Sequence, residues 1–222
     1  MKPESIQRLI SLKHKHEKTG ATMDAMRRRF DRLASRHEDG TAPQAITAFN
    51  LFQTPEPIAA RMAAMVAEHV QPGNRILEPS AGLGRLYKAL RVAIPESCRV
   101  VMVENAPDCG RELYRIAGDT PGDRLFQRDF MELDFGDLEG TFQAVCMNPP
   151  FKMGTDIKHI LHAFDMLAPG GLLVGLCYNG VKQNAILRGL TTTWEVLPEG
   201  SFKASGTGAS VVILTMKRTL RA

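Results

Sequence analysis

Residues 75–84 read Arg-Ile-Leu-Glu-Pro-Ser-Ala-Gly-Leu-Gly, a short apolar run that passes directly into a glycine turn. The apolar run predicts a buried strand, and the residues after the turn, up to about Ile94, have the spacing of a helix. Two glycines in the turn let the backbone bend tightly and approach a ligand without an intervening side chain. This order predicts an α/β domain with a ligand beside the turn.

Strands and helices alternate outward from this stretch, from about residue 49 onward. Such alternation predicts a mostly parallel sheet covered by helices on both faces, with ligands at the carboxyl ends of the strands. We expect Pro169-Gly170-Gly171 to be a turn and the chain to close with a pair of strands. The expected strands are 75–79, 98–105, 124–130, 142–150, 172–177, 194–198 and 210–218, and the expected helices are 56–70, 85–94, 111–118 and 155–168.

The N-terminal residues 1–43 differ in character from residues 44–222, and we expect them to form a helical extension to the α/β domain. The first 40 residues carry ten Lys and Arg against six acidic residues. Three interpretations stay open: a solvated helical hairpin, an arm that contacts nucleic acid, and a homodimer interface. In the second, Arg27, Arg28 and Arg29 are candidate phosphate contacts. Apolar residues at helical spacing support the helix: Met23, Met26, Phe30 and Leu33.

The composition suits a globular domain, because a chain of 222 residues with 44% hydrophobic residues can bury a full core. A net charge of +4 is compatible with a polyanionic partner but does not require one. The chain shows neither a secretory signal nor an apolar run of membrane-spanning length, so we expect a soluble cytoplasmic protein. Four cysteines lack metal-ligand spacing, so reduced core thiols and no metal are expected: Cys98, Cys109, Cys146 and Cys177.

Carboxylates follow three successive strands of the expected sheet. Glu78 stands directly before the glycine turn, where it could pair with an ammonium group, and Glu104 ends the second strand, where it could accept hydrogen bonds from a ribose diol. Asp129 and Phe130 close the third strand, where they suit an adenine amino group and the edge of its ring. No group nearby supplies the positive charge that phosphates need, and Tyr87 replaces the small residue of a dinucleotide fingerprint. The pattern favours S-adenosylmethionine as cofactor.

Asn148-Pro149-Pro150-Phe151 follows the fourth strand. An aromatic amino group is a poor nucleophile because its lone pair is delocalised into the ring. The Asn148 side-chain oxygen and the Pro149 carbonyl could bind its two hydrogens and aim the lone pair at a methyl donor. The rigid proline pair would fix these acceptors, and Phe151 offers a face on which a base can stack. The tetrapeptide therefore predicts methylation of an exocyclic amino nitrogen.

With these motifs, the stretch from about residue 49 to residue 217 resembles the class I S-adenosylmethionine-dependent methyltransferases. It is most similar to the amino-methyltransferases with an N/D-P-P-Y/F/W tetrapeptide, and among these to DNA adenine-N6 methyltransferases of the phage and prophage type. The resemblance implies a Rossmann-like seven-stranded sheet with helices on both faces. Residues 49–55 contain the family's Phe-x-Thr-Pro element, which implies that Thr54 holds the methionine carboxylate of the cofactor.

The resemblance and the motifs together give the candidate site residues. The catalytic candidates are Asn148, Pro149, Pro150 and Phe151. The cofactor-binding candidates are Phe52, Thr54, Glu78, Ser80, Gly82, Gly84, Glu104, Asn105, Asp129, Phe130 and Asn148. The substrate-binding candidates are Phe151, Lys152, Lys203, Arg27, Arg28 and Arg29.

The expected substrate is adenine N6 in DNA, reached by flipping the base out of the helix. Too few residues follow Phe151 for a separate target-recognition domain, which argues against strong sequence specificity. Three other readings stay open: an RNA methyltransferase acting on guanine N2 or adenine N6, a protein-glutamine methyltransferase, and a non-catalytic partner subunit. Residues 202–210 and 179–182 are candidate substrate-facing loops, whereas His159 and His162 are interpreted as ordinary helix residues.

Overall fold

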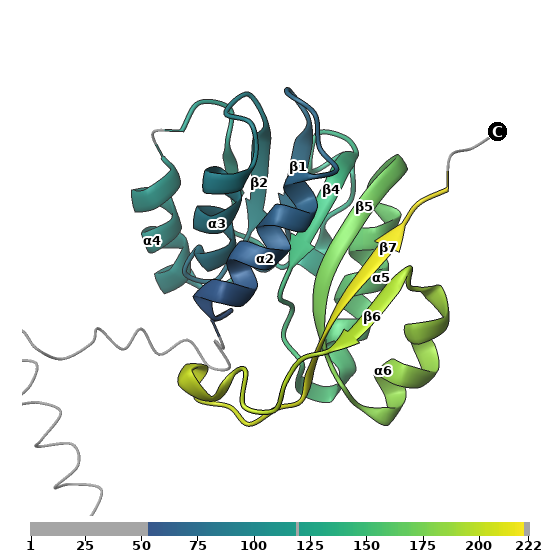
Figure 1. Cartoon of the computed structure of the whole chain (residues 1–222). Helices are drawn as coiled ribbons and strands as arrows, with labels where there is room; N and C mark the ends of the chain where they lie inside the picture. The colour runs from purple at the N-terminus through teal and green to yellow at the C-terminus, as the bar shows by residue number, and fades with distance from the viewer. Residues whose placement is uncertain (1–52, 119, 220–222) are drawn as a thin grey trace, which may run out of the picture. The chain divides into compact units, whose positions relative to one another are not determined.

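The computed structural model describes residues 53–118 and 120–219, whose strands form one seven-stranded sheet in the order β3-β2-β1-β4-β5-β7-β6 (Figure 1). β1 to β5 pair in parallel, and β7 runs antiparallel between β5 and β6. The strand order reverses between β1 and β4, so their carboxyl ends flank the crevice in which such sheets bind ligands. The strands are β1 Arg75–Glu78, β2 Arg99–Val103, β3 Arg124–Phe126, β4 Phe142–Met147, β5 Leu167–Tyr178, β6 Thr193–Val196 and β7 Val211–Lys217.

Helices connect the strands and cover both faces of the sheet (Figure 1). Several start at residues suited to a helix N-terminus: a proline lies in the first turn of α2 and of α4, and left-handed glycines precede α3 and α5. The helices are α2 Glu56–Ala67, α3 Arg85–Ala93, α4 Pro107–Ala117, α5 Thr155–Asp165 and α6 Val181–Ile186.

Alternate strand residues build two cores on opposite faces of the sheet. Ile76 of β1 packs into the core that α2 and α3 cover with Met62 and Leu90, while the next residue, Leu77, packs into the core that α5 covers with Ile160. All five side chains are fully buried. A strand with both faces buried is apolar throughout, which explains why the strands read as continuous apolar runs. The predicted seven-stranded α/β sheet is confirmed.

Some predicted boundaries are wrong. Pro169-Gly170-Gly171 is not a turn but an irregular part of β5, where Phe142 pairs with Leu167 and Ala144 already pairs with Leu172. Gly170 has a φ of 80° there, and its N–H donates to the Arg218 carbonyl, so the irregular segment keeps its ladder contact with the end of β7. The third strand ends at Phe126 rather than at residue 130, α4 begins at Pro107 rather than at residue 111, and α6 was not predicted.

The four cysteines are buried and form no disulfide in the described part of the chain. No helix among residues 53–118 and 120–219 is long and apolar enough to cross a membrane. The predicted helical extension of residues 1–43 lies outside the described residues and stays a prediction, as do its phosphate contacts and its homodimer interface.

Candidate active site

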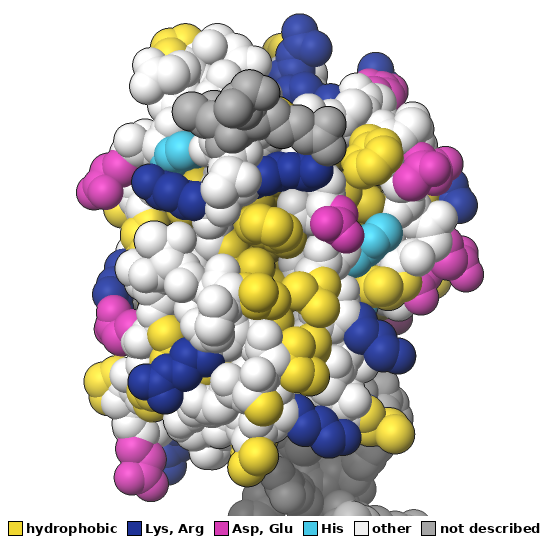
Figure 2. All heavy atoms as spheres, turned by 90° about the vertical axis from the view of Figure 1, so that its right-hand side faces the viewer, with side chains coloured by type: hydrophobic (Ala, Val, Ile, Leu, Met, Phe, Trp, Pro, Cys, Tyr) yellow, Lys and Arg dark blue, Asp and Glu magenta, His cyan; other side chains and the backbone are white. Residues whose placement is uncertain are grey.

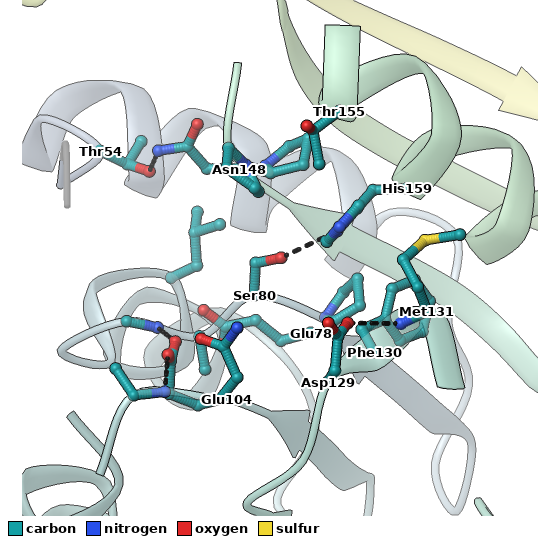
Figure 3. Close-up of a pocket in the computed structure, with 18 of the residues that line it drawn as sticks. Thr54, Glu78, Ser80, Glu104, Asp129, Phe130, Met131, Asn148, Thr155 and His159 are labelled. Atoms are coloured by element: carbon teal, nitrogen blue, oxygen red, sulfur yellow. Dashed lines mark hydrogen bonds between the residues drawn. The ribbon is translucent and has the colours of Figure 1, made fainter. Parts of the chain in front are cut away.

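A cavity of about 500 Å³ opens at the carboxyl edge of the sheet, where β1, β2 and β4 end (Figure 3). Its walls come from the turn after β1, the residues that follow β2, β3 and β4, and the first turns of α5. The carboxyl ends of neighbouring parallel strands meet at one edge, so motifs far apart in sequence converge there.

Glu78 ends β1 inside this cavity. Its side chain is buried, and its Oε2 atom has no hydrogen-bond partner among the described residues. Burial, and secondarily the charge of Glu104, raise the pKa of Glu78 well above its usual range. A buried carboxyl oxygen without a partner is costly to the ligand-free fold, and a cationic hydrogen-bond donor entering the cavity would relieve that cost.

Glu104 follows β2 directly and holds the glycine turn in place. Its Oε2 accepts a hydrogen bond from the Gly82 N–H at 2.7 Å, and its Oε1 accepts one from the Ala106 N–H at 2.8 Å. Gly82 has a φ of 54°, a backbone conformation that favours glycine. Each carboxylate oxygen keeps a second lone pair, so Glu104 can organise the turn and still accept hydrogen bonds from a diol.

Gly84 does not line the cavity, although the sequence placed it among the cofactor-binding residues. It precedes α3 in the left-handed conformation, with a φ of 75°. A Cβ atom at this position would lie 2.4 Å from Ile116 Cδ1 and 3.0 Å from Leu113 Cδ2. Gly84 is therefore required for close packing of α3 against α4.

Asp129 lies three residues beyond the end of β3 rather than closing it. Its Oδ1 accepts a hydrogen bond from the Met131 N–H at 2.9 Å and caps a short 3₁₀ helix, Phe130–Glu132. Phe130 lines the cavity but is 2% exposed, with its ring packed against the rings of His159 and His162. Phe130 thus lies in the cavity wall next to Asp129, with most of its ring packed against α5.

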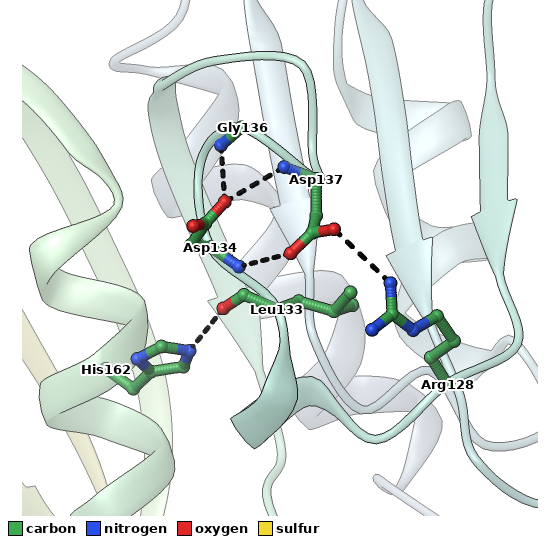
Figure 4. Close-up of polar contacts among 6 residues, drawn as sticks. All are labelled: Arg128, Leu133, Asp134, Gly136, Asp137 and His162. Carbon is green, nitrogen blue, oxygen red and sulfur yellow. Dashed lines mark hydrogen bonds and ion pairs between the residues drawn. The ribbon is translucent and has the colours of Figure 1, made fainter.

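The loop that carries Asp129 is fixed by polar contacts after the 3₁₀ helix (Figure 4). Asp134 Oδ1 accepts from the N–H groups of Gly136 and Asp137, and these backbone contacts lower the pKa of the Asp134 carboxyl. Arg128 pairs with Asp137 at 3.3 Å, and His162 Nε2 lies 2.8 Å from the Leu133 carbonyl oxygen. The contacts of Asp134 and Asp137 close the loop on itself, and the His162 contact ties it to α5.

The tetrapeptide Asn148–Phe151 follows β4 and lines the cavity. Asn148 Nδ2 donates a hydrogen bond to Thr54 Oγ1 at 3.1 Å, which directs the amide oxygen of Asn148 away from Thr54 (Figure 3). Pro149 is buried, whereas Phe151 is half-buried and packs at the border of the core that α2 covers. The site therefore combines a fixed amide, a rigid backbone carbonyl and a partly exposed ring.

His159 is a cavity residue that the sequence analysis interpreted as an ordinary helix residue. It lies one turn after Thr155 on α5, is 8% exposed, and places Nδ1 3.4 Å from Ser80 Oγ (Figure 3). Burial lowers its pKa, although the nearby Asp129 charge acts the other way. The spacing of Thr155 and His159 puts both on one helix face, which is the sequence pattern that could have identified them.

Cations also line the cavity, which corrects the expectation that no positive charge lies near. Arg85, Arg128 and Lys158 all contribute to its wall. Arg85 pairs with Glu56, Arg128 pairs with Asp137, and Lys158 is exposed. Arginines that are already paired with carboxylates attract phosphate less than unpaired ones would, so Arg85 and Arg128 by themselves do not make this cavity a phosphate site.

The structure brings most of the predicted cofactor and catalytic residues together around one cavity. Gly84 lies behind it, Lys152 and Lys203 are exposed outside its wall, and Phe52 and Arg27 to Arg29 lie outside the described residues. Within the described chain, no group of three or more His, Cys, Asp or Glu side chains could hold a metal ion. The cavity-lining residues predicted from sequence are Thr54, Glu78, Ser80, Gly82, Glu104, Asn105, Asp129, Phe130, Asn148, Pro149, Pro150 and Phe151.

The fold is that of the class I methyltransferases. Its seven-stranded sheet has one antiparallel strand, β7, at the penultimate position, and the cavity lies where the strand order reverses. No family model and no curated protein matches this sequence. Solved structures do match it, at identities of 20% or less in the three described next.

The methyltransferase subunit of a type I restriction-modification system from Streptococcus thermophilus aligns with a TM-score of 0.63 and 18% identity, over 75% of this chain and 45% of that one. An RNA methyltransferase from Salinibacter ruber, solved with S-adenosyl-L-homocysteine, aligns with a TM-score of 0.52 and 20% identity, over 77% of this chain and 95% of that one. A SAM-dependent O-methyltransferase from Thermotoga maritima gives a TM-score of 0.55 and 17% identity, over 78% and 69% of the two chains. The present chain thus spans less than half of the restriction-modification subunit.

Proposed function

We propose that this protein transfers a methyl group from S-adenosylmethionine to an exocyclic amino nitrogen of a nucleic-acid base, namely adenine N6 in DNA. The observation that carries the proposal is the meeting of Asn148–Phe151 with the carboxyl groups of Glu78, Glu104 and Asp129 around one cavity. The similar solved structures include methyltransferases named for RNA and for restriction-modification systems, which supports a nucleic-acid substrate.

The residues of the cavity fit the proposed cofactor. The partnerless Oε2 of Glu78 suits a buried ammonium group, and Glu104 suits a ribose diol. Asp129 would accept a hydrogen bond from the adenine amino group, next to Phe130 in the cavity wall. When bound, S-adenosylmethionine supplies an electrophilic methyl group.

The tetrapeptide would position the nucleophile. Asn148 Oδ1 and the Pro149 carbonyl would accept the two hydrogens of the target amino group, so its lone pair points toward the methyl carbon. The Asn148–Thr54 hydrogen bond fixes which end of the amide faces the base. The carbon–nitrogen bond would form as the methyl–sulfur bond breaks and its electron pair stays on the sulfur. Asn148 Oδ1 and the Pro149 carbonyl would stabilise the positive charge on the methylated nitrogen until it loses one proton to solvent. Phe151 would stack on the flipped base.

Label transfer tests the proposal directly. Tritiated S-adenosylmethionine is incubated with the protein and with duplex DNA, single-stranded DNA, ribosomal RNA or total protein, and labelled products are digested and identified by nucleoside mass spectrometry. We expect N6-methyladenine in DNA, and no label with Asn148→Ala. Label confined to RNA or protein would overturn the DNA substrate, and a wild-type protein that labels nothing would overturn the enzymatic function.

A further inference from the structure

Two loops leave neighbouring strands at the edge of the sheet that carries the catalytic tetrapeptide. Residues 151–154 follow β4 and residues 179–182 follow β5, and these two strands pair in parallel up to Met147 and Gly175. Both loops therefore leave the same edge of the sheet from neighbouring strands, at the edge where Asn148 lies.

A buried carboxylate clamps the two loops together. Asp156, at the start of α5, is fully buried, and its Oδ2 accepts from the Tyr178 N–H at 3.0 Å. Both of its oxygens also lie 3.0 Å from Gln183 Nε2 in the first turn of α6. The chain passes so closely here that a Cβ atom on Gly180 would lie 2.7 Å from Gln183 Oε1 and 2.8 Å from the Tyr178 ring. The loops are therefore held in one arrangement.

Each clamped loop presents an apolar side chain to solvent. Met153 is 91% exposed and Val181 is 88% exposed, so neither contributes burial to the fold. Met153 also has a φ of 55°, in the left-handed region that residues other than glycine rarely adopt. Met153 lies three residues before Asp156, and Val181 lies two residues before Gln183. Each apolar residue is therefore within roughly 10 Å, along the chain, of a residue that takes part in the clamp. Strained, exposed residues beside an active site are candidates for a functional role.

The charge of this rim is one-sided. Lys152 and Lys182 are the sequence neighbours of the two apolar residues, and both are exposed. Neither residues 151–154 nor residues 179–182 include an acidic side chain. On the face that carries α6 and β6, apolar side chains form a band with Lys and Arg side chains on both sides, and Asp and Glu side chains also lie on this face (Figure 2). An apolar edge beside cations suits a partner with stacked bases and a phosphate backbone.

We propose that Met153 and Val181 form an apolar wedge that enters a nucleic-acid duplex beside the target base, while Lys152 and Lys182 hold the flanking phosphates. The inference rests on the proposed function and adds how the base would leave its helix. Extruding a base loses its stacking and pairing, and an apolar side chain in the gap offsets part of that loss. The rigid clamp matters because a wedge on a mobile loop would lose entropy on insertion.

The test compares duplex with single-stranded substrate. The double variant Met153→Ala/Val181→Ala should lose about tenfold or more in kcat/KM on a DNA duplex, because opening a duplex costs a few kcal/mol. On the same strand without its complement the loss should stay within about threefold, since no base has to be unpaired. The matched control is Val92→Ala, which removes a side chain that is 90% exposed at the end of α3.

The lysines are tested by binding. Lys152→Gln/Lys182→Gln should weaken duplex binding and lower the slope of log affinity against log salt by up to about 0.9 per lysine. Lys88→Gln, an exposed lysine on α3, should leave both unchanged.

Equal losses on duplex and single strand would overturn the wedge, because they would indicate a general effect on the site. An unchanged kcat/KM on both substrates, or a wild-type protein that methylates single strands only, would overturn it as well. A wild-type protein without activity on any nucleic acid would refute the proposed function itself, and the wedge with it. The wild-type activity thus separates the two failures.

Discussion

At the residue scale, the environment of the Glu78 side chain gives the strongest indication of which ligand group the cavity binds. It ends β1 with a buried carboxyl oxygen that has no partner among the described residues. A folded protein retains such a group at a cost in stability, because ionising it without water or a counter-charge is unfavourable. We therefore propose that Glu78 serves ligand binding rather than folding.

We expect Glu78→Gln to stabilise the ligand-free protein at mildly alkaline pH. The pKa of Glu78 is raised in the folded state, so the folded protein binds the proton more tightly than the unfolded chain does. Wild-type stability should then fall as the pH rises above the ordinary glutamate pKa of about 4.3, and the advantage of the glutamine should vanish below it. Thermal melts across pH measure this, with the exposed Glu96→Gln as control.

The same substitution should weaken cofactor binding. Hydrogen bonds to charged groups contribute about 1.5–3 kcal/mol, so we expect Glu78→Gln to lower the affinity for S-adenosylmethionine by roughly 10- to 100-fold in calorimetry. A variant that is both more stable and equally tight in binding would refute the ammonium-binding role.

Asn148 acts on the substrate side of the cavity. We expect Asn148→Ala to reduce methyl transfer by roughly 100- to 1,000-fold, as loss of one preorganised polar group typically does. Cofactor affinity should stay within a few-fold, which calorimetry can measure in the same preparation. Thr54→Val tests the orienting hydrogen bond separately, because it removes the hydroxyl but keeps the amide itself. Thr54 is also a cofactor-binding candidate, so the cofactor affinity of this variant is measured beside its activity. Full methyl-transfer activity in Asn148→Ala would contradict the proposed role of Asn148 in positioning the target amino group.

At the element scale, the contacts of Asp156 join α5, the end of β5 and α6. Removing a buried carboxylate leaves the Tyr178 N–H and the Gln183 amide without an acceptor. We expect Asp156→Ala to lower the free energy of unfolding by about 2–4 kcal/mol, measured by urea denaturation. Asp165→Ala, an exposed position at the end of the same helix, should change it by less than about 0.5 kcal/mol. Equal effects would show that the carboxylate is not a clamp.

The elements were predicted unequally well from sequence. The inner strands β1, β2, β4, β5 and β7 were found because both of their faces are largely buried, which gives an apolar run that local sequence reveals. α6 was missed because it is only six residues long and most of its side chains are exposed. Asp129 was placed at the end of a strand because apolar spacing does not distinguish an extended residue from the cap of a 3₁₀ helix.

At the scale of the whole molecule, a prediction concerns the basic N-terminal residues, for which the sequence offers a phosphate-contacting arm. If the basic segment contacts phosphates, Arg27→Gln/Arg28→Gln/Arg29→Gln should weaken DNA binding and reduce the slope of log affinity against log salt by up to about 2.7. Fluorescence anisotropy over a range of salt concentrations measures both. Replacing the exposed Lys88 and Lys217 by glutamine is the control within the described domain. Unchanged affinity and slope would leave the solvated hairpin or the dimer interface.

The sequence by itself determined the fold class and the convergence of the main site residues. Three carboxylates and the Asn-Pro-Pro-Phe tetrapeptide each follow an apolar run. In a parallel sheet the ends of such runs share one edge, so local pattern and the rules of strand connection suffice to bring Glu78, Glu104 and Asn148 to one cavity.

The tertiary structure alone decided which side chains pair across the chain. The Thr54–Asn148 hydrogen bond joins residues 94 positions apart. Ser80 lies within hydrogen-bond distance of His159, and Asp156 accepts a hydrogen bond from Gln183. Gly84 proved to be a packing residue because Ile116 of another helix presses against it. Such contacts depend on the rotation and position of each helix on the sheet. Close packing of the whole core determines both, and the local spacing of residues does not predict them.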